Sequence, residues 1–316
     1  MTSSAPAGQI SARLVLFSAH PCLHPPFICY YNSNGTIALI LLRSTIVTER
    51  KLILLTNDDG VDSPGLWAAA EQLDALGEIW VVAPLTQQTS VGRGMSPLYT
   101  GRMEFRTRAL NGRTFMAYGA DASPALAVQH ALLEILPRQP DLVVSGINYG
   151  ENIGSGVTVS GTVGAALEAA CNGLPALAIS LETDPEHYHS HSDAVDFSVA
   201  AHFTRLFAEK ALALKFPPDV DVLKVEIPKS ATIHTPWQIT RLSRTRYYVP
   251  VKPQRTLLTE PGPLTAVNFL EDDRVEPDSD VKVVVVDKQI SVTPLSFDLT
   301  SRVALTDVKR LLDGEG

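Results

Sequence analysis

The sequence predicts an α/β protein with a doubly wound, mostly parallel sheet of the Rossmann-like kind and a β-rich C-terminal arm. Two observations support this prediction: apolar runs of strand length recur from Lys51 onward, and stretches with helical spacing separate them. Continuous apolar runs suit strands covered on both faces, and strands that alternate with helices imply right-handed crossovers. The runs are KLILLT, IWVVA, DLVVSG and ALAIS, at residues 51–56, 79–83, 141–146 and 176–180.

The connecting segments carry the start and stop signals of helices. In the first, Ser63 is predicted as the N-cap, Pro64 as the first helical residue and Gly77 as the stop. Its apolar side chains share one face: Leu66, Ala69, Ala70 and Leu73. Two further helices are predicted within residues 123–136 and 161–173. Another long helical stretch is predicted to run as far as Leu214.

The chain changes character at about residue 219. The runs VLKVEIP, WQITRL and VKVVVV, at residues 222–228, 237–242 and 281–286, have strand-like composition. A basic and aromatic stretch at residues 244–258 has two open interpretations: it contacts nucleotide bases or a neighbouring subunit, or it is an ordinary β-hairpin with solvated arginines. We therefore expect one domain over residues 51–316, with a β-rich arm at about 220–290.

Residues 1–50 differ from the rest. They contain no acidic residue before Glu49, and they mix proline, serine and short apolar pieces. The longest apolar piece, IALILL, is far too short to span a bilayer. We expect a poorly ordered extension rather than a targeting segment, because arginines are few and no charged region precedes an apolar one.

The composition of the 316-residue chain excludes several classes of protein. A net charge of -8 argues against binding to a nucleic-acid polymer, which usually requires a basic patch, and no apolar run suggests a membrane partner. Cys22, Cys29 and Cys171 are odd in number and form no C-x-x-C pair, so neither a disulfide framework nor a zinc site is indicated. A reducing, cytoplasmic location is expected.

The sequence NDDG, residues 57–60, follows directly after the first apolar run. Ligands of open α/β sheets bind outside the carboxyl ends of the strands. The loops after the second and third runs, at residues 83–94 and 146–164, are rich in Asn, Ser, Thr and Gly and should reach the same edge. We therefore expect these three loops to meet at one site.

This edge offers groups for an anion and for a cation. The helix start at residues 160–162 can present backbone N–H groups to a phosphate, but two neighbouring carboxylates would repel that phosphate. A hard cation between them removes the conflict, since carboxylate, amide and hydroxyl oxygens suit Mg²⁺ or Mn²⁺. P-loop, dinucleotide and G-x-S-x-G signatures are absent from the sequence. The segment EHYHSHSD, residues 186–193, is interpreted as a solvated loop rather than a metal site.

Five segments in order resemble the SurE family of survival-protein nucleotidases. They are ILLTNDDGVDSPG, VVAP with the Ser/Thr loop that follows it, SGINYGENIG, SGTVGAALEA and PALAISL. The late segment ISVTPLSFDLT resembles the closing strand of that family, so the likeness covers residues 51–312 and leaves the N-terminal extension unexplained.

The resemblance implies a divalent-metal-dependent phosphoric monoester hydrolase that acts on nucleoside 5′- and 3′-monophosphates, and some members also cleave short polyphosphate. It implies one Mg²⁺ or Mn²⁺ per subunit and a homodimer or homotetramer assembled through the C-terminal region. Carried over by motif, the metal ligands are Asp58, Asp59, Thr89 and Asn148, and the two aspartates are also the catalytic residues. The residues expected to surround the substrate are Asn57, Gly60, Ser90, Asn152, Ser160, Gly161 and Thr162.

Three alternatives stay open at this point. Counting from Pro84 without a gap places the hydroxyl ligand at Thr89, whereas Ser90 has the usual residue type. Either a water molecule or one of the two aspartates attacks phosphorus, and a water is preferred. The third alternative is a non-catalytic sensor that binds metal and nucleotide without turnover.

Overall fold

The chain divides into two compact units, Met1–Glu49 and Arg50–Gly316. The computed structural model describes residues 50–188, 190–192, 194–270 and 275–314, together with two short strands in the first unit. These strands, β1 (Ile28–Tyr31) and β2 (Ile37–Ile40), pair antiparallel. Most of the extension predicted for residues 1–50 lies outside the described residues.

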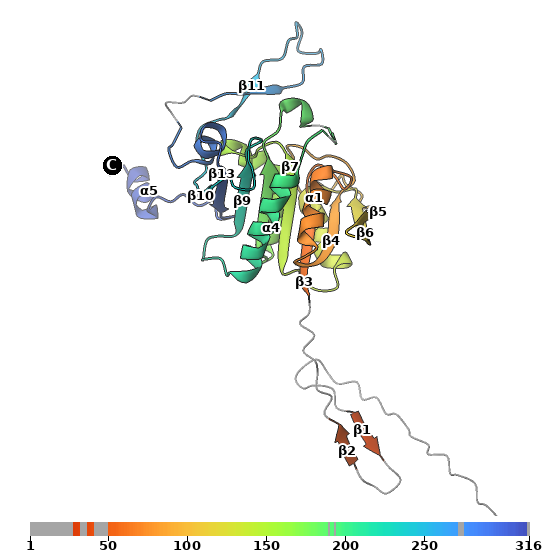
Figure 1. The fold of residues 1–316 in the computed structure, drawn as a ribbon. Coiled ribbons are helices and arrows are strands. Elements are labelled where there is room, and N and C mark those ends of the chain that lie inside the picture. The colour runs from red at the N-terminus through yellow and green to blue at the C-terminus, as the bar shows by residue number, and fades with distance from the viewer. Residues whose placement is uncertain are drawn as a thin grey trace, which may run out of the picture. The chain divides into compact units, whose positions relative to one another are not determined.

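The second unit is built on a nine-stranded sheet in the order β10-β13-β9-β8-β7-β3-β4-β6-β5 (Figure 1). The central strands of this sheet run parallel, and among its described pairs the antiparallel ones are β9 with β13 and β5 with β6. This confirms the predicted fold class. The strands are β3 (Lys51–Thr56), β4 (Gly77–Pro84), β5 (Met103–Leu110), β6 (Arg113–Ala120), β7 (Leu142–Tyr149), β8 (Ala176–Leu181), β9 (Val222–Ile227), β10 (Trp237–Ile239) and β13 (Ile290–Leu295).

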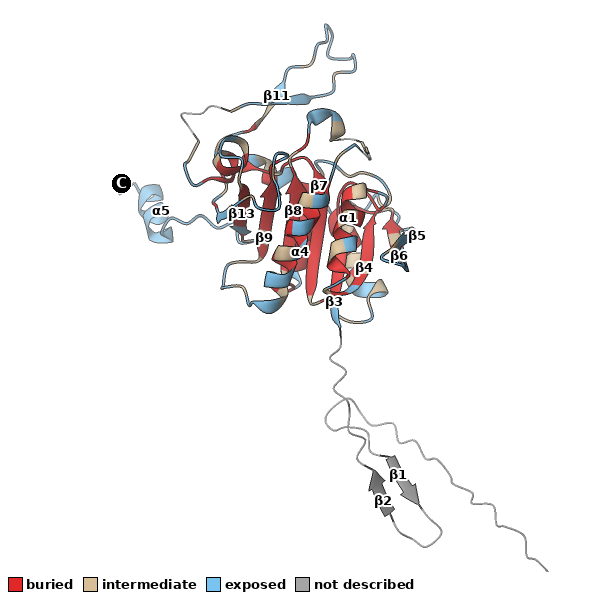
Figure 2. Ribbon diagram, in the orientation of Figure 1, coloured by how far each residue is buried: buried red, intermediate tan, exposed pale blue. Residues whose placement is uncertain are grey.

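Helices cover both faces of the sheet. On one face, α1 (Pro64–Leu73) and α4 (Ser198–Ala213) pack over one apolar core. On the other face, α2 (Pro124–His130) and α3 (Gly161–Cys171) pack over a second core. Figure 2 shows the central strands buried beneath these layers. Burial on both faces is the physical reason that these strands read as continuous apolar runs.

The predicted helix boundaries agree with the structure at most ends. Ser63 is the N-cap of α1 and Pro64 its first residue, but the helix ends at Leu73, and Gly77 already belongs to β4. The helix predicted at 123–136 begins as α2 and continues as one π-helical turn, η1 (Ala131–Ile135). Gly173, with φ +77°, follows α3 as predicted.

The strand order fixes where a site can form. From β3 the chain first builds outward through β4 and then returns to add β7 on the other side of β3. The loops after β3 and β7 therefore diverge at neighbouring carboxyl ends, which is the position where open α/β sheets bind ligands.

The C-terminal region contains an exposed hairpin of β11 (Tyr248–Val251) and β12 (Thr265–Asn268), and a last helix, α5 (Leu305–Leu312). No residue of α5 is buried (Figure 2). Among the described residues, no helix combines the length and the apolar character needed to cross a membrane.

One strand prediction is wrong. Residues 281–286 do not form a strand, and Lys282–Val286 is a helical turn, η5. The strand position beside β9 is occupied by β13, where Ser291 pairs with Glu226. Val281 and Val284, three positions apart, bury together as helical spacing requires. A short run of valines suits either structure, so composition alone could not decide.

Candidate active site

The loop after β3 is shaped by Asn57 and Gly60. The side-chain nitrogen of Asn57 donates to the Gly60 carbonyl over 3.0 Å, and the Gly60 N–H donates back to Asn57 Oδ1 over 3.2 Å. Asn57 is fully buried, and Gly60 has a φ of +102°, which favours glycine. Both polar ends of the Asn57 side chain are therefore used within the turn that presents the two aspartates.

Asp58 faces the first turn of α3. The Thr162 hydroxyl donates to Asp58 Oδ1 over 2.5 Å, and a Cβ added to Gly161 would lie 2.8 Å from Asp58 Oδ2. Ser160 caps the helix, since its hydroxyl accepts from the Val163 N–H over 3.1 Å. The anion at this helix start is thus the Asp58 carboxylate, and the absence of a side chain at Gly161 permits the close approach.

Asp59 is held by the segments after β7 and β4. The Tyr149 N–H donates to Asp59 Oδ2 over 3.2 Å, and the Gln87 side-chain amide donates to Oδ1 over 3.2 Å. The same Gln87 nitrogen donates to the Tyr188 carbonyl over 2.6 Å. Nε2 of the exposed His191 lies 2.8 Å from the Asp59 carbonyl, which can only accept, so Nε2 carries the proton.

Asn148 keeps one side-chain oxygen available. Its amide nitrogen donates to the carbonyls of Tyr149 and Gly150, over 3.1 and 2.7 Å. These two bonds fix the amide orientation and leave Oδ1 as the atom that can accept or ligate. The backbone N–H of the next residue, Tyr149, binds Asp59, and the role of the Asn148 side chain as a metal ligand stays a prediction.

Burial makes the two aspartates costly as anions. Asp58 is 5% exposed and Asp59 is 2% exposed. Burial raises the pKa of Asp58 to about 6, although the Thr162 hydroxyl and backbone groups at the start of α3 oppose that rise. Burial, and then repulsion from Asp58, raise the pKa of Asp59 well above its usual range. No lysine or arginine among the described residues binds either carboxylate.

Comparison with known proteins identifies the family. The family model described as "Survival protein SurE" matches residues 53–249. The protein named 5′-nucleotidase SurE of Thermococcus gammatolerans is 40% identical over 266 residues, covering 83% of this chain and 96% of the relative. The chain belongs to the SurE family. The 5′-nucleotidase SurE of Thermococcus kodakarensis is 38% identical over 261 residues, covering 82% of this chain and 98% of that one.

The structural comparison agrees. The crystal structure of the SurE protein from Aquifex aeolicus covers 83% of this chain and 100% of its own, with a TM-score of 0.65 and 30% sequence identity. The resemblance noted in the sequence is therefore confirmed. The curated SurE relatives are named as 5′-nucleotidases, which are phosphoric monoester hydrolases, so the chain belongs to a family of enzymes.

A divalent cation fits the SurE aspartate pair. Within the described ranges no group of three or more His, Cys, Asp or Glu side chains is arranged to hold a metal, so the donors here are two carboxylates and neutral oxygens. Such a hard oxygen set suits Mg²⁺ or Mn²⁺. The buried hydroxyls of Thr56 and Ser145, paired across β3 and β7, have no hydrogen-bond partner in the described part of the chain. Unpaired polar atoms and unpaired charge at these strand ends both indicate a ligand site.

The hydroxyl ligand implied by the SurE resemblance lies on the loop after β4. Thr89 and Ser90 are both exposed, and Ser90 has a φ of +63°. The loop is anchored beside them, because the Gln88 N–H donates to the Asp58 carbonyl over 2.7 Å. No side-chain bond joins Thr89 or Ser90 to either aspartate within the described residues, and the choice between them stays a prediction.

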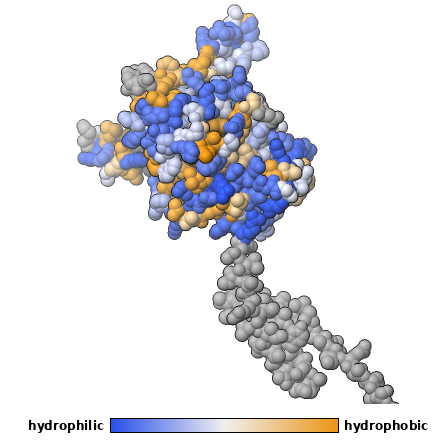
Figure 3. Space-filling model, in the orientation of Figure 1, coloured by the Kyte–Doolittle hydropathy of each residue, from blue (hydrophilic) through white to orange (hydrophobic). Residues whose placement is uncertain are grey.

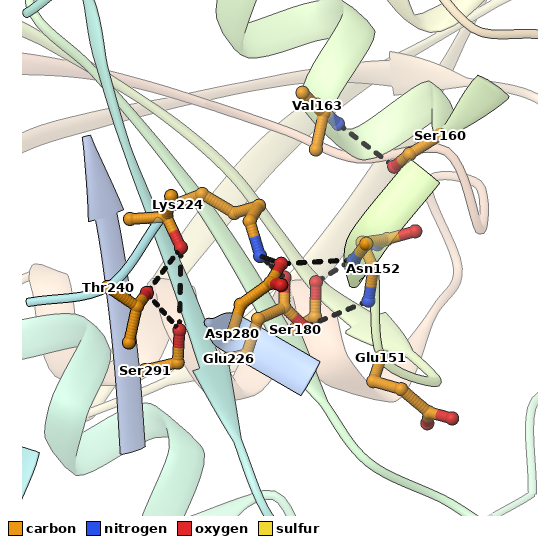
Figure 4. Close-up of polar contacts among 12 residues, drawn as sticks. Glu151, Asn152, Ser160, Val163, Ser180, Lys224, Glu226, Thr240, Asp280 and Ser291 are labelled. Atoms are coloured by element: carbon orange, nitrogen blue, oxygen red, sulfur yellow. Dashed lines mark hydrogen bonds and ion pairs between the residues drawn. The ribbon is translucent and has the colours of Figure 1, made fainter. Parts of the chain in front are cut away.

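Asn152 is not brought to the aspartates by any hydrogen bond in the described residues. Its side chain donates to the Ser180 hydroxyl over 3.0 Å, at the end of β8 (Figure 4). Gly150, with φ +95°, lies between Asn148 and Asn152, and its N–H donates to the Leu181 carbonyl at the same strand end. In the four positions from Asn148 to Asn152, the chain therefore passes from the β3 side of the sheet toward the end of β8.

Sequence reasoning missed Gln87, Tyr188 and His191. Gln87 lay in a loop already predicted to reach the site, but only its neighbours were singled out. His191 was interpreted as part of a solvated loop; it is exposed, yet its ring contacts Asp59. His189 and Asp193 of the same segment lie outside the described residues. Neither Tyr188 nor His191 carries a local signal, because each depends on how the loop after β8 returns over the sheet.

Two hollows on the surface lie apart from the aspartates. One of about 400 Å³ is lined by Asp141, Leu174 and Phe216, near the amino ends of the strands. The other, of about 200 Å³, lies beside the end of β8 and is lined by His187 and Lys229 among others. Neither contains Asp58 or Asp59. The aspartate pair remains the candidate site because it combines buried charge, which no lysine or arginine of the described residues binds, with the helix start that Asp58 faces.

Proposed function

We propose that this SurE protein is a divalent-metal-dependent phosphomonoesterase that converts nucleoside 5′- and 3′-monophosphates to nucleoside and phosphate. The observation that supports this most directly is that Asp58 and Asp59 are buried after β3, that Asp58 faces the start of α3, and that no lysine or arginine of the described residues binds either carboxylate. Its relatives named 5′-nucleotidase supply the substrate class. Cleavage of short polyphosphate is part of the same proposal.

The proposed metal is one Mg²⁺ or Mn²⁺ per subunit. Asp58, Asp59 and the Oδ1 of Asn148 would hold it, with Thr89 or Ser90 as the hydroxyl ligand. A divalent cation supplies positive charge that neutralises phosphoryl oxygens and makes a bound water more acidic. The remaining chemistry belongs to residues of the chain.

The protein residues would act by orientation and by charge stabilisation. Thr162 holds the Asp58 carboxylate in one orientation, while Tyr149 and Gln87 hold that of Asp59. Backbone N–H groups at the start of α3 favour negative charge nearby, which suits a phosphoryl group in its transition state. Attack by a water is the preferred route, and attack by one of the aspartates is the alternative. Trapping of a phosphorylated enzyme would separate the two routes.

Homodimer or homotetramer formation and a cytoplasmic location remain proposals. The first is supported by apolar side chains exposed in the C-terminal region, and Figure 3 shows hydrophobic residues reaching the surface on that side of the molecule. Those of the hairpin region and α5 are Val251, Leu257, Leu258, Leu264, Val267, Phe269, Leu305, Val308, Leu311 and Leu312. The proposed cytoplasmic location rests on the cysteine content alone.

The test is phosphate release by purified protein from 5′- and 3′-nucleoside monophosphates and tripolyphosphate, with Mg²⁺, Mn²⁺ or EDTA. Asp59→Asn is compared with Asp62→Asn, whose exposed carboxylate lies three positions further on and pairs with Arg106 at the surface. We expect cation-dependent release that Asp59→Asn lowers by at least about 100-fold and Asp62→Asn leaves unchanged. Folded protein that binds metal and nucleotide but releases no phosphate would instead be a sensor.

A further inference from the structure

A second group of buried charges lies near the site. Lys224 and Glu226 project from β9, and Asp280 lies just before η5; all three side chains are 0% exposed. Lys224 Nζ lies 3.0 Å from Asp280 Oδ2 and 3.5 Å from Glu226 Oε1 (Figure 4). Burial lowers the pKa of Lys224, but attraction to the two carboxylates outweighs it and raises that pKa, so the residue stays charged. These three residues are called the charge cluster below.

The charge cluster holds the chain that follows β7. The Asn152 N–H donates to Glu226 Oε2 over 2.9 Å, and the Gly154 N–H donates to Asp280 Oδ2 over 3.1 Å. Gly154 has a φ of +54°, and a Cβ there would lie 2.8 Å from the Thr245 carbonyl. The backbone is therefore fixed at this point by charge-assisted hydrogen bonds and by close packing.

The same stretch of chain, residues 148–162, binds both aspartates at its ends. At the first end, the Tyr149 N–H donates to Asp59 Oδ2. At the other end, the Thr162 hydroxyl donates to Asp58 Oδ1. The two bonds to the charge cluster lie between these ends, so the cluster determines where the middle of the stretch sits relative to β9.

We propose that the charge cluster is a positioning device for the metal site: it fixes the middle of residues 148–162 so that the Tyr149 N–H and the Thr162 hydroxyl reach the aspartates together. This inference rests on the proposed function. None of the three cluster residues contacts the aspartates, and each acts through the stretch that it holds.

A purely stabilising role explains the charge cluster less well. Buried ion pairs give little net stability, because desolvation of the charges offsets their attraction, and apolar side chains of similar volume often do as well. Apolar side chains could not accept hydrogen bonds from the N–H groups of Asn152 and Gly154. The carboxylates of Glu226 and Asp280 accept these bonds, and the ammonium of Lys224 compensates their buried negative charge.

The test uses Asp280→Asn in the full-length protein. This change preserves the shape of the side chain. The new amide nitrogen would face Lys224 and the Gly154 N–H, and it cannot accept a hydrogen bond from either, so the stretch loses its hydrogen bond to residue 280. Val225→Ala is the matched control, since Val225 lies between Lys224 and Glu226 on β9 but packs into the core on the opposite face. Mn²⁺ binding is measured by calorimetry, beside the melting temperature without metal and the KM and kcat for a nucleoside monophosphate.

We expect Asp280→Asn to weaken Mn²⁺ binding by about 10-fold or more. Val225→Ala should lower the melting temperature and leave Mn²⁺ binding within about twofold of wild type. Glu226→Gln, which keeps an acceptor for the Asn152 N–H, should show a smaller loss of affinity, and it decides the question if Asp280→Asn does not fold.

Near-wild-type Mn²⁺ binding in the folded variants would overturn the positioning role. Wild type that binds Mn²⁺ without releasing phosphate would overturn the proposed function instead, and calorimetry would still test the positioning role.

Discussion

The Asp58–Asp59 pair and the charge cluster are two solutions for burying carboxylates in one sheet. In the charge cluster, Glu226 and Asp280 share the ammonium of Lys224 and accept four backbone N–H bonds, from Asn152, Gly154, Ser243 and Val281. The aspartate pair accepts the Tyr149 N–H, the Thr162 hydroxyl and the Gln87 side-chain amide, and backbone groups at the start of α3 also stabilise the Asp58 carboxylate. No cationic side chain among the described residues binds either carboxylate.

The difference lies in the source of the compensating charge. The chain supplies it in the charge cluster, which therefore needs no ligand. At the aspartate pair no lysine or arginine of the described residues does so, and under the proposed function a divalent cation from solution provides the balance. Buried negative charge is thus part of a structural element in the charge cluster, where a lysine accompanies it. At the aspartate pair, where no lysine does so in the described residues, it marks a candidate binding site.

The largest expected effect is a contrast in stability between Lys224→Met and Asp59→Asn. Lys224→Met leaves Glu226 and Asp280 without their cation and should reduce the free energy of unfolding by about 3–5 kcal/mol. Asp59→Asn removes one of two mutually repelling carboxylates and should increase that free energy in metal-free protein. Urea denaturation in EDTA measures both. The contrast is contradicted if Asp59→Asn is less stable than Lys224→Met under these conditions.

The second prediction concerns pH. The pKa of Asp58 is about 6 in the folded protein, against 3.8 for the free side chain. Because the folded state holds this proton more tightly, its contribution to stability is complete below pH 4 and is lost as pH rises through 6. For this group the loss is on the order of 3 kcal/mol.

Thermal denaturation of metal-free protein between pH 4 and pH 7 checks this, with Asp58→Asn as the reference that lacks the group. The difference between the two curves should grow with pH, and saturating Mn²⁺ should reduce it in the wild type. Parallel curves would mean that Asp58 titrates normally.

A third, smaller effect is expected from Thr162→Val, which removes the hydroxyl that binds Asp58 and keeps the shape. A hydrogen bond to a charged group contributes about 1.5–3 kcal/mol, so Mn²⁺ affinity should fall by about 10-fold or more. Thr158→Val is the control, because the exposed Thr158 hydroxyl only donates to the Ser155 carbonyl in the preceding turn. Equal binding by the two variants would remove Thr162 from the site.

The smallest expected effect is that of Ser160→Ala. Its hydroxyl accepts from the neutral Val163 N–H, so losing the cap should lower stability by about 1 kcal/mol, with or without metal. Chemical denaturation, with the exposed Ser155→Ala as the reference, measures it. A loss seen only with metal would show that Ser160 serves the ligand rather than the helix.

Local signals made much of the fold and part of the site predictable. A buried strand that ends in NDDG and a helix that begins at SGT each lie within a few residues, and strand order brings them to one edge. By contrast, Lys224 and Glu226 resemble ordinary polar residues of an alternating strand, and Asp280 lies 56 positions beyond Lys224. No local pattern connects them.

The same limit explains the wrong strand prediction. The valine run at 281–286 contains nothing that distinguishes a strand from a helical turn, and the position beside β9 was already taken by β13. The Asn152 side chain donates to Ser180, and its predicted place beside the substrate stays a prediction.

The position of the site between β3 and β7 has a consequence for the order in which a growing chain can acquire it. Domains fold as synthesis proceeds from the N-terminus. A nascent chain holds both aspartates long before Thr162, 104 positions after Asp58, has been made, and Asp280 follows Gly154 by a further 126 positions. The two aspartates therefore precede the chain that orients them, and under the proposed function metal binding by the ordered site waits until synthesis is nearly finished.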